Sequence, residues 1–225
     1  MFSALPLVLA LSLSIARPGG DAEAAARLAG AAARFDAEAF TGSYVKTTRT
    51  QVISGGAVLL DEMETVRVVV RDGRRSSELL SATAGGRDVT SEKLPSAAPE
   101  PGAAPALAFA PPGGLSFRPL TLDGSACGAA FGAALAPDPP AAGRLPEGKL
   151  AWDCSSGTPL WAEFRPTDAP AELTEPRARL EFARAGDLLY AARYTLEGRI
   201  ADGAETVTMR LVQEISDLRP LSARQ

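Results

Sequence analysis

The stretch LLYAARYTLEGRIADGAETVTMRLVQEI, residues 188–215, contains two consecutive β-strand patterns. Apolar side chains recur at alternate positions, at Leu188, Tyr190, Ala192, Tyr194 and Leu196 in the first run and at Val207, Met209, Leu211 and Ile215 in the second. Side chains of a strand point alternately to opposite faces, so each run predicts one apolar and one mostly polar face. Ala201-Asp202-Gly203 supplies a turn between the runs. The stretch therefore predicts an antiparallel sheet with one face against a hydrophobic interior or a ligand and the other in water.

Similar runs occur through most of the chain. They are separated by Gly-Gly, Asp-Gly and Pro-containing turn signals and cover residues 43–53, 57–71, 74–84, 115–122, a stretch around Phe131, 149–153, 158–165 and 177–184. In one of them, Leu160, Ala162 and Phe164 are expected to share a strand face. Together these runs predict about nine or ten strands, arranged as a meander of neighbouring hairpins.

One helix is predicted before the strands, over residues 21–40. Leu28, Ala31, Ala32 and Phe35 recur there at helical spacing and form a narrow apolar stripe. An alanine-rich stripe is expected where a helix packs closely on a sheet. The predicted fold class is therefore α+β, mainly β, with an N-terminal helix covering the apolar face of the sheet.

Residues 1–16 are almost uninterrupted apolar sequence. A membrane-spanning helix needs about 20 apolar residues, so this run is too short. Ser14 and Ala16 provide the small side chains that a signal peptidase requires. We therefore predict a cleaved export signal and a periplasmic or secreted protein, with an uncleaved N-terminal anchor as the alternative. Cleavage after Ala16 would leave residues 17–225, which we expect to form a single domain.

The chain contains two cysteines, Cys127 and Cys154. In an exported protein such a pair most often forms a disulfide. A redox-active or metal-binding pair is the alternative, but the Cys-x-x-Cys spacing typical of such sites is missing. The disulfide would stabilise the fold by about 3–4 kcal/mol in the chain-entropy model.

The chain has no histidine, which excludes Ser-His-Asp and Cys-His catalysis and His-based zinc sites. Phosphate-binding and dinucleotide-binding glycine motifs are also missing, and a net charge of −4 gives no sign of a nucleic-acid partner. We therefore predict a protein that is not an enzyme and that needs no cofactor or metal.

A carboxylate-dependent hydrolase is the remaining enzymatic hypothesis, since Asp61, Glu62 and Glu64 cluster and the two glutamates would share a strand face. We interpret them as a solvated strand end. Trp161 is expected on the polar face or at a sheet edge. An exposed tryptophan there either marks a binding surface or has no role in binding. The proline-rich residues 91–114 predict either an exposed connection or a lid over the apolar face.

The chain resembles the LolA-like superfamily of periplasmic lipoprotein carriers, which includes the LolA and LolB carriers and the sensor domain of RseB-type regulators. The resemblance rests on Leu150-Ala151-Trp152-Asp153 followed by Ser156-Gly157-Thr158-Pro159-Leu160, and on the closing Ser216-Asp217-Leu218-Arg219. It spans residues 21–220. It implies a curved, unclosed antiparallel sheet, or half-barrel, whose concave face is covered by helices and takes lipid acyl chains.

This chain departs from the family in several ways. Only one helix is predicted, and 209 residues leave no room for the second domain of RseB-type regulators. The arginine that gates the carriers has no assignable counterpart, although Arg49 and Arg67 lie on suitable strands.

The resemblance implies a carrier or sensor that binds lipid or lipoprotein acyl chains in an apolar cavity. The alternative is an envelope protein–protein interaction module without a lipid ligand. Strand parity gives the candidate cavity residues as Val66, Val68, Val70, Leu160, Phe164, Leu180, Phe182, Tyr190, Tyr194, Met209 and Leu211. For each of them the alternative role is a dry core packed against the helix.

Overall fold

A computed structural model describes residues 18–35, 40–71, 74–93, 115–122, 126–133, 147–166, 169–202 and 205–221. The elements in these ranges are α1 (Pro18–Ala33), β1 (Gly42–Ser54), β2 (Ala57–Arg71), β3 (Arg74–Ala84), β4 (Arg87–Asp88), β5 (Leu115–Leu120), β6 (Ala126–Ala133), β7 (Gly148–Asp153), β8 (Pro159–Phe164), β9 (Thr174–Ala185), β10 (Leu188–Asp202) and β11 (Glu205–Pro220). The predicted export signal and most of the proline-rich segment lie outside the described residues.

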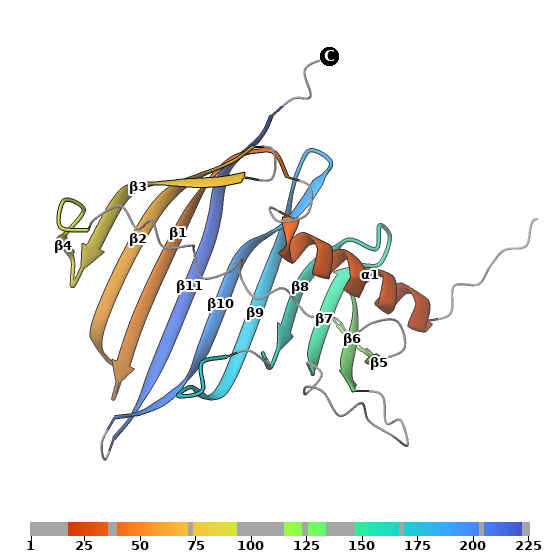
Figure 1. The fold of residues 1–225 in the computed structure, drawn as a ribbon. Coiled ribbons are helices and arrows are strands. Elements are labelled where there is room, and N and C mark those ends of the chain that lie inside the picture. Colours follow the sequence, from red (N-terminus) through yellow and green to blue (C-terminus); the bar gives the residue numbers. More distant parts are fainter. Residues whose placement is uncertain are drawn as a thin grey trace, which may run out of the picture.

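All strands belong to one antiparallel sheet with the order β4-β3-β2-β1-β11-β10-β9-β8-β7-β6-β5 (Figure 1). Two meanders, β1–β4 and β5–β11, join where β1 pairs with β11, from Gly42 opposite Pro220 to Ile53 opposite Thr208. The predicted meander is therefore interrupted once, because β4 and β5 lie at opposite edges of the sheet.

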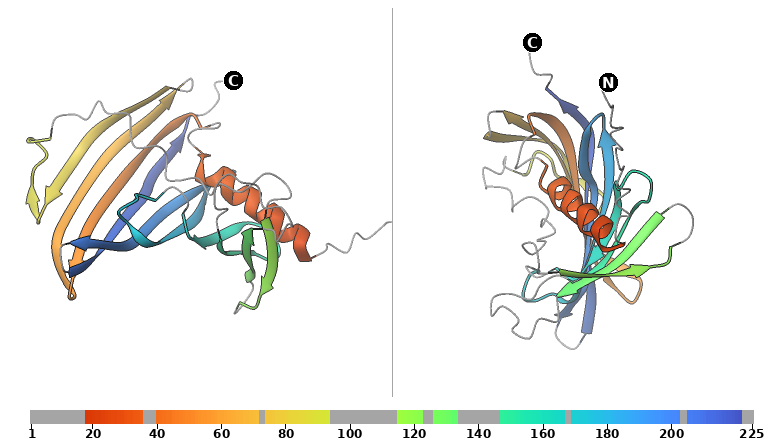
Figure 2. Two further views of the ribbon diagram at one scale, coloured as in Figure 1. Left: turned by 60° about the horizontal axis from the view of Figure 1, so that its bottom comes forward. Right: turned by 90° about the vertical axis from the view of Figure 1, so that its right-hand side faces the viewer.

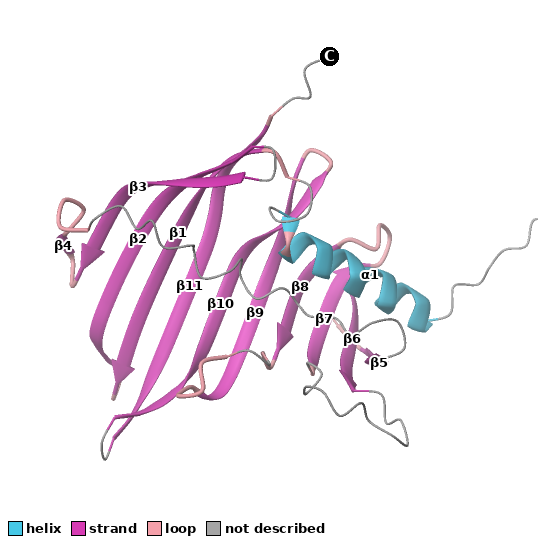
Figure 3. Ribbon diagram, viewed as in Figure 1, coloured by secondary structure: helices cyan, strands magenta, loops and turns pink. Residues whose placement is uncertain are grey.

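The sheet is curved and unclosed, and α1 lies across one of its faces (Figure 2). The fold class predicted from the sequence, an N-terminal helix on a curved antiparallel half-barrel, is thus confirmed (Figure 3). The sheet has eleven strands, where nine or ten were predicted. One of the eleven, β4, has only two residues. Gly55 and Gly56 close the β1–β2 hairpin with φ values of 55° and 86°, a conformation that favours glycine.

The helix differs from the prediction in its bounds and in the face that it buries. It begins at Pro18, a residue suited to a first helical turn, and ends at Ala33. Leu28 is 45% exposed and Ala31 is exposed, so the predicted stripe is wrong at these two positions. The buried stripe consists of Ala22, Ala25, Ala26, Ala29, Ala32 and Ala33. Alanines let the helix axis approach the sheet, where a leucine would hold it away.

The helix packs against β5 and β7–β10. No helix among the described residues is long and apolar enough to span a membrane.

Two groups of buried side chains form the core. The helix cluster contains five alanines of α1, Ala22, Ala25, Ala26, Ala29 and Ala33, with Ala129, Phe131, Leu150, Trp152, Ala162, Phe164, Ala178, Leu180, Ala191 and Tyr194. The Tyr44 cluster contains Phe35, Phe40, Tyr44, Val66, Val68 and Val70. Phe35 follows α1 and its ring lies 5.6 Å from that of Tyr44 and 5.7 Å from that of Tyr190. The chain that leaves the helix therefore caps the second cluster.

The predicted disulfide is confirmed. Cys127 of β6 bonds to Cys154, which follows β7, with a Cα–Cα distance of 5.1 Å. The bond ties two neighbouring strands on the part of the sheet that α1 covers.

Candidate functional site

Register places one row of helix-facing side chains across five strands. Its members are Ala129, Leu150, Ala162, Leu180 and Tyr194. Each of them is at most 3% exposed, because α1 lies above this part of the sheet. This half of the face is therefore filled by packing.

The same face continues on β11, β1 and β2, beyond the strands against which α1 packs. Register aligns Leu196 with Leu211 and Gly198 with Met209, and Met209 with Val52 and Leu60 in turn. We call Val52, Leu60, Met209 and Leu211 the Met209 strip. Three of these side chains are half-buried and Leu60 is 40% exposed. This part of the face retains apolar surface.

The candidate cavity residues separate into different environments. Val66, Val68 and Val70 are at most 8% exposed in the Tyr44 cluster, and Tyr190 packs against them. Phe164, Leu180 and Tyr194 are at most 6% exposed in the helix cluster, with Phe182 and Leu211 at its margin. Met209 is half-buried in the Met209 strip. Four candidates thus keep accessible surface on this face, namely Phe182, Tyr190, Met209 and Leu211.

The prediction that Leu160 shares a strand face with Ala162 and Phe164 is wrong. Leu160 is 40% exposed, while Pro159 is fully buried. The register of β7 with β8 shifts between Ala151 and Trp152, so that Pro159 pairs with Trp152. A bulge adds one residue to a strand, and the expected parity is lost beyond it.

The carboxylates of the hydrolase hypothesis do not converge. Glu62 and Glu64 alternate with Asp61 on β2, so the two glutamates share a face, as predicted, and Asp61 faces the other way. Glu64 accepts a hydrogen bond from Lys93 at 3.0 Å. Asp61 accepts two from Arg49, at 2.6 and 2.7 Å, and these bonds lower the pKa of Asp61. No group of three or more acidic or cysteine side chains among the described residues is placed to hold a metal ion.

Arg49 and Arg67 lie on the outer face of the sheet, opposite α1. Arg67 pairs with Glu78 of β3 at 3.0 Å, and Arg49 with Asp61. Strand alternation directs both side chains away from the Tyr44 cluster and the Met209 strip. Neither arginine is therefore placed to gate a ligand on the helix-facing side.

The outer face carries a network of ion pairs between neighbouring strands. Arg179 pairs with Glu163 and with Glu181, and its guanidinium carbon lies 5.1 Å from the centre of the Trp161 ring. The predicted position of Trp161 on the polar face is thus confirmed, whereas Trp152 lies in the core with 5% exposure. Such exposed pairs contribute about 0–1 kcal/mol each. They keep this face in water and direct the apolar face inward.

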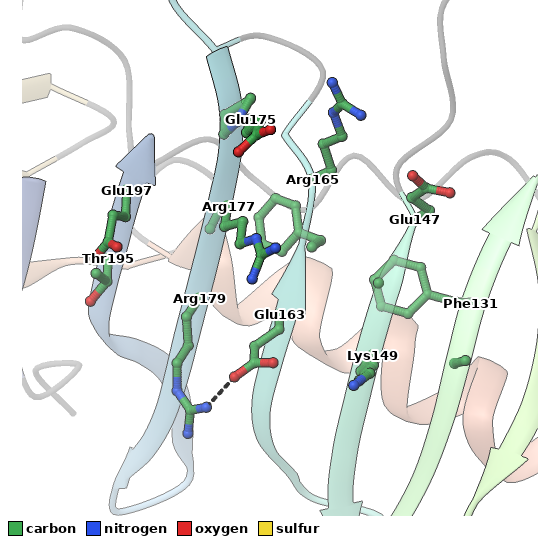
Figure 4. A pocket seen from close by; sticks show the side chains of 15 residues that line it. Phe131, Glu147, Lys149, Glu163, Arg165, Glu175, Arg177, Arg179, Thr195 and Glu197 are labelled. Carbon is green, nitrogen blue, oxygen red and sulfur yellow. Dashed lines mark hydrogen bonds and ion pairs between the residues drawn. The ribbon is translucent and has the colours of Figure 1, made fainter. Parts of the chain in front are cut away.

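A hollow of about 880 Å³ lies over this charged face, with α1 behind the sheet (Figure 4). We call it the outer hollow. Its charged lining residues are Glu147, Lys149, Glu163, Arg165, Glu175, Arg177, Arg179 and Glu197. Sequence analysis did not identify it, because alternating charges on a strand are also what any solvated face shows. Only the register of β7–β10 brings these side chains together.

The tip of the β1–β2 hairpin exposes apolar side chains. Val58, Leu59 and Leu60 are 51%, 62% and 40% exposed. Pairing of β2 with β3 ends at Glu62 opposite Ala84, so residues 57–61 extend beyond the paired part of β3. We call residues 57–61 the β2 edge.

No protein-family model matches the chain, and no curated protein does. Among solved structures, it is similar to a LolA superfamily protein from Nitrosomonas europaea, with 12% identity, a TM-score of 0.40, and coverage of 89% of this chain and 94% of that one. A DUF1329 family protein from Desulfovibrio piger has 10% identity and a TM-score of 0.40, with coverage of 91% and 93%. MucB in complex with MucA(peri) has 13% identity and a TM-score of 0.18, with coverage of 88% and 99%.

All of these identities and TM-scores are low, and the resemblance to LolA-like proteins rests on the sequence motifs.

Proposed function

We propose that this protein is a non-enzymatic carrier or sensor that binds lipid or lipoprotein acyl chains on the helix-facing side of its sheet. The chain begins with a sequence typical of an export signal, which supports a periplasmic or secreted location. The proposal requires an apolar surface that an acyl chain can contact and needs no catalytic group.

The observation that carries the proposal is the unequal packing of the helix-facing side. The helix packs on β5 and β7–β10, whereas the same face continues through β11, β1 and β2, where apolar side chains alternate with polar ones such as Thr50, Glu62 and Gln213. There the Met209 strip keeps half-buried or exposed aliphatic side chains, next to the margin of the helix cluster at Leu211. Neighbouring strands lie about 4.8 Å apart, so Met209, Val52 and Leu60 span about 10 Å across three strands and would contact part of an acyl chain.

Burial of an acyl chain supplies enough free energy without polar contacts. Each buried CH₂ group contributes about 0.8 kcal/mol, and a long chain therefore roughly 10 kcal/mol before ordering costs. The four accessible candidates, Phe182, Tyr190, Met209 and Leu211, are aromatic or flexible aliphatic side chains that adapt to such a ligand.

A fluorescent fatty acid added to the purified protein tests the proposal, together with native mass spectrometry of lipid retained through purification. We expect saturable binding of the probe and its displacement by unlabelled fatty acid. Replacing Leu211 by Gln should weaken binding, whereas Val212→Gln, on the opposite face of the same strand, should not. The proposal fails if no lipid is retained and no probe binds.

A second candidate function is an interaction module for another envelope protein, and the β2 edge favours it. Exposed strand edges with apolar side chains are surfaces on which a partner strand can pair. Under this alternative, Leu59→Asp abolishes partner binding and fatty-acid probes do not bind. Under the carrier proposal, Leu59→Asp leaves probe affinity unchanged, because Leu59 lies outside the Met209 strip.

A further inference from the structure

We propose that the outer hollow binds an oxyanion, a phosphate or carboxylate group of a small organic molecule or of a lipid headgroup, through Lys149, Arg165 and Arg177. This site lies on the face opposite to the proposed acyl-binding surface and does not depend on it.

The three cations come from adjacent strands. Lys149 lies on β7, Arg165 directly follows β8, and Arg177 lies on β9. Phe164 pairs with Ala178, so the next residues, Arg165 and Arg177, are cross-strand neighbours. The backbone N–H of Arg165 donates to the carbonyl of Glu147 at 3.0 Å, which extends the row to the strand end of β7. Figure 4 shows these side chains around the hollow.

Most of the acidic side chains around the hollow are engaged by other cations. Glu163 pairs with Arg179, Glu175 with Arg199 at 3.4 Å, and Glu197 with Arg210 at 2.8 Å. Among the described residues, Lys149, Arg165 and Arg177 have no ion-pair partner. Glu147 has none either, so the unengaged charge around the hollow is three positive against one negative.

On one side Arg177 lies opposite Glu197, but that carboxylate pairs with Arg210. On its other side it lies opposite Arg165, and two like charges at opposed strand positions are destabilising. An oxyanion between them removes this repulsion. The planar guanidinium forms paired hydrogen bonds with phosphate or carboxylate, and a nearby ammonium adds a point charge. These are the groups that Arg165, Arg177 and Lys149 provide.

The size of the hollow indicates the class of ligand. Pockets for small organic molecules have volumes of about 300–1,000 Å³, and a hollow of about 880 Å³ lies in this range. Ala130 and Pro176 contribute apolar lining beside the cations. A ligand with an oxyanion and an organic body therefore fits better than a bare inorganic ion.

Isothermal titration of the full chain with sn-glycerol 3-phosphate tests the inference, with inorganic phosphate as the second probe. We expect glycerol phosphate to bind more tightly than inorganic phosphate and its affinity to fall as salt is added. Replacing Arg165 or Arg177 by Gln should weaken binding about tenfold. Replacing Glu147 by Gln should strengthen it, because the one unengaged acid at the hollow is removed.

Arg219→Gln is the matched control, since it removes one exposed cation from the end of β11 opposite Ser43, whereas the hollow borders the part of β10 that pairs with Arg210. Its affinity should equal that of the wild type. A gain of affinity in Glu147→Gln cannot arise from misfolding, so the sign of the effects remains informative even if an arginine variant is unstable. The inference is overturned if none of the probes binds, or if Arg219→Gln weakens binding as much as Arg177→Gln.

Vesicles distinguish the two sources of the anion. Sedimentation with phosphatidylcholine vesicles, with and without phosphatidylglycerol, measures headgroup binding. Binding only to the anionic vesicles, lost in Arg177→Gln and retained in Arg219→Gln, would assign the site to a lipid headgroup. Binding of soluble glycerol phosphate without vesicle binding would assign it to a free organic phosphate. If neither vesicles nor soluble probes bind, the site does not exist.

Discussion

The two halves of the helix-facing surface bury their apolar side chains to different extents. Under α1, alanines of the helix meet Leu150, Ala162 and Leu180, all of them without exposed surface. On β11, β1 and β2, the Met209 strip keeps half-buried or exposed apolar side chains. Small residues allow a helix to seal one half of a curved sheet, but a helix of sixteen residues reaches only part of an eleven-stranded face. The remainder is the part that a ligand can use.

The helix-covered half should depend most on its disulfide. Replacing both Cys127 and Cys154 by Ser should lower the free energy of unfolding by about 2–5 kcal/mol, because the unfolded chain is no longer constrained. Urea unfolding of the oxidised wild type and the double variant measures this difference. If the variant is as stable as the wild type, the covered half is held by its core alone.

Overpacking beneath the helix should give the next largest effect. Ala29 has no exposed surface, so Ala29→Leu should cost about 1–3 kcal/mol of stability as the helix is pushed from the sheet. Leu28 is 45% exposed, and Leu28→Ala should change stability by less than about 0.5 kcal/mol. Thermal unfolding of the two variants compares neighbouring positions of one helix. Equal losses would mean that the buried stripe is misassigned.

A substitution in the Met209 strip should affect binding more than stability. Leu211→Gln should weaken the binding of a fluorescent fatty acid about tenfold, because the apolar contacts of a half-buried leucine contribute about 1–1.5 kcal/mol. Val212→Gln, on the outer face of the same strand, is its control. A displacement titration and an unfolding curve of each variant separate the two effects. Equal affinities in the two variants would favour the alternative function, an interaction module without a lipid ligand.

The smallest expected effect concerns pH. Asp153 accepts hydrogen bonds from Ser155 and from the backbone of Ser156, which lower its pKa from 3.8 to about 2. A carboxyl with a lowered pKa stabilises the folded state above its unfolded pKa, and this contribution is lost as the pH falls from about 4 to about 2. Urea midpoints of Asp153→Asn should therefore fall less over this range than those of the wild type. Parallel pH profiles would show that the β7–β8 turn contributes nothing to acid stability.

Strand patterns in the sequence predicted much of the sheet, because alternation is a local property. The bounds of β2 and β3 agree with the predicted runs at residues 57–71 and 74–84. The disulfide also followed from composition and compartment. The predictions that were wrong are those that depend on tertiary contacts. The bulge that exposes Leu160 and the choice of the helix face that leaves Leu28 exposed both depend on packing against other elements.

The candidate site was predictable only in part. Parity identified apolar residues of the helix-facing side, but it could not tell the sealed ones, such as Leu180, from accessible ones, such as Met209. That distinction depends on where α1 ends. The outer hollow was not predicted from the sequence. Its cations come from β7, from the residue after β8 and from β9, and only the register of the sheet brings them together.

Photo-crosslinking with a diazirine fatty acid, followed by peptide mass spectrometry, tests the central claim most directly. The account predicts labels on helix-facing residues of β11, β1 and β2, above all Met209 and Leu211, and competition by unlabelled fatty acid. Labels confined to Val58 and Leu59, or spread over the outer face without competition, would contradict an acyl-binding surface beyond α1.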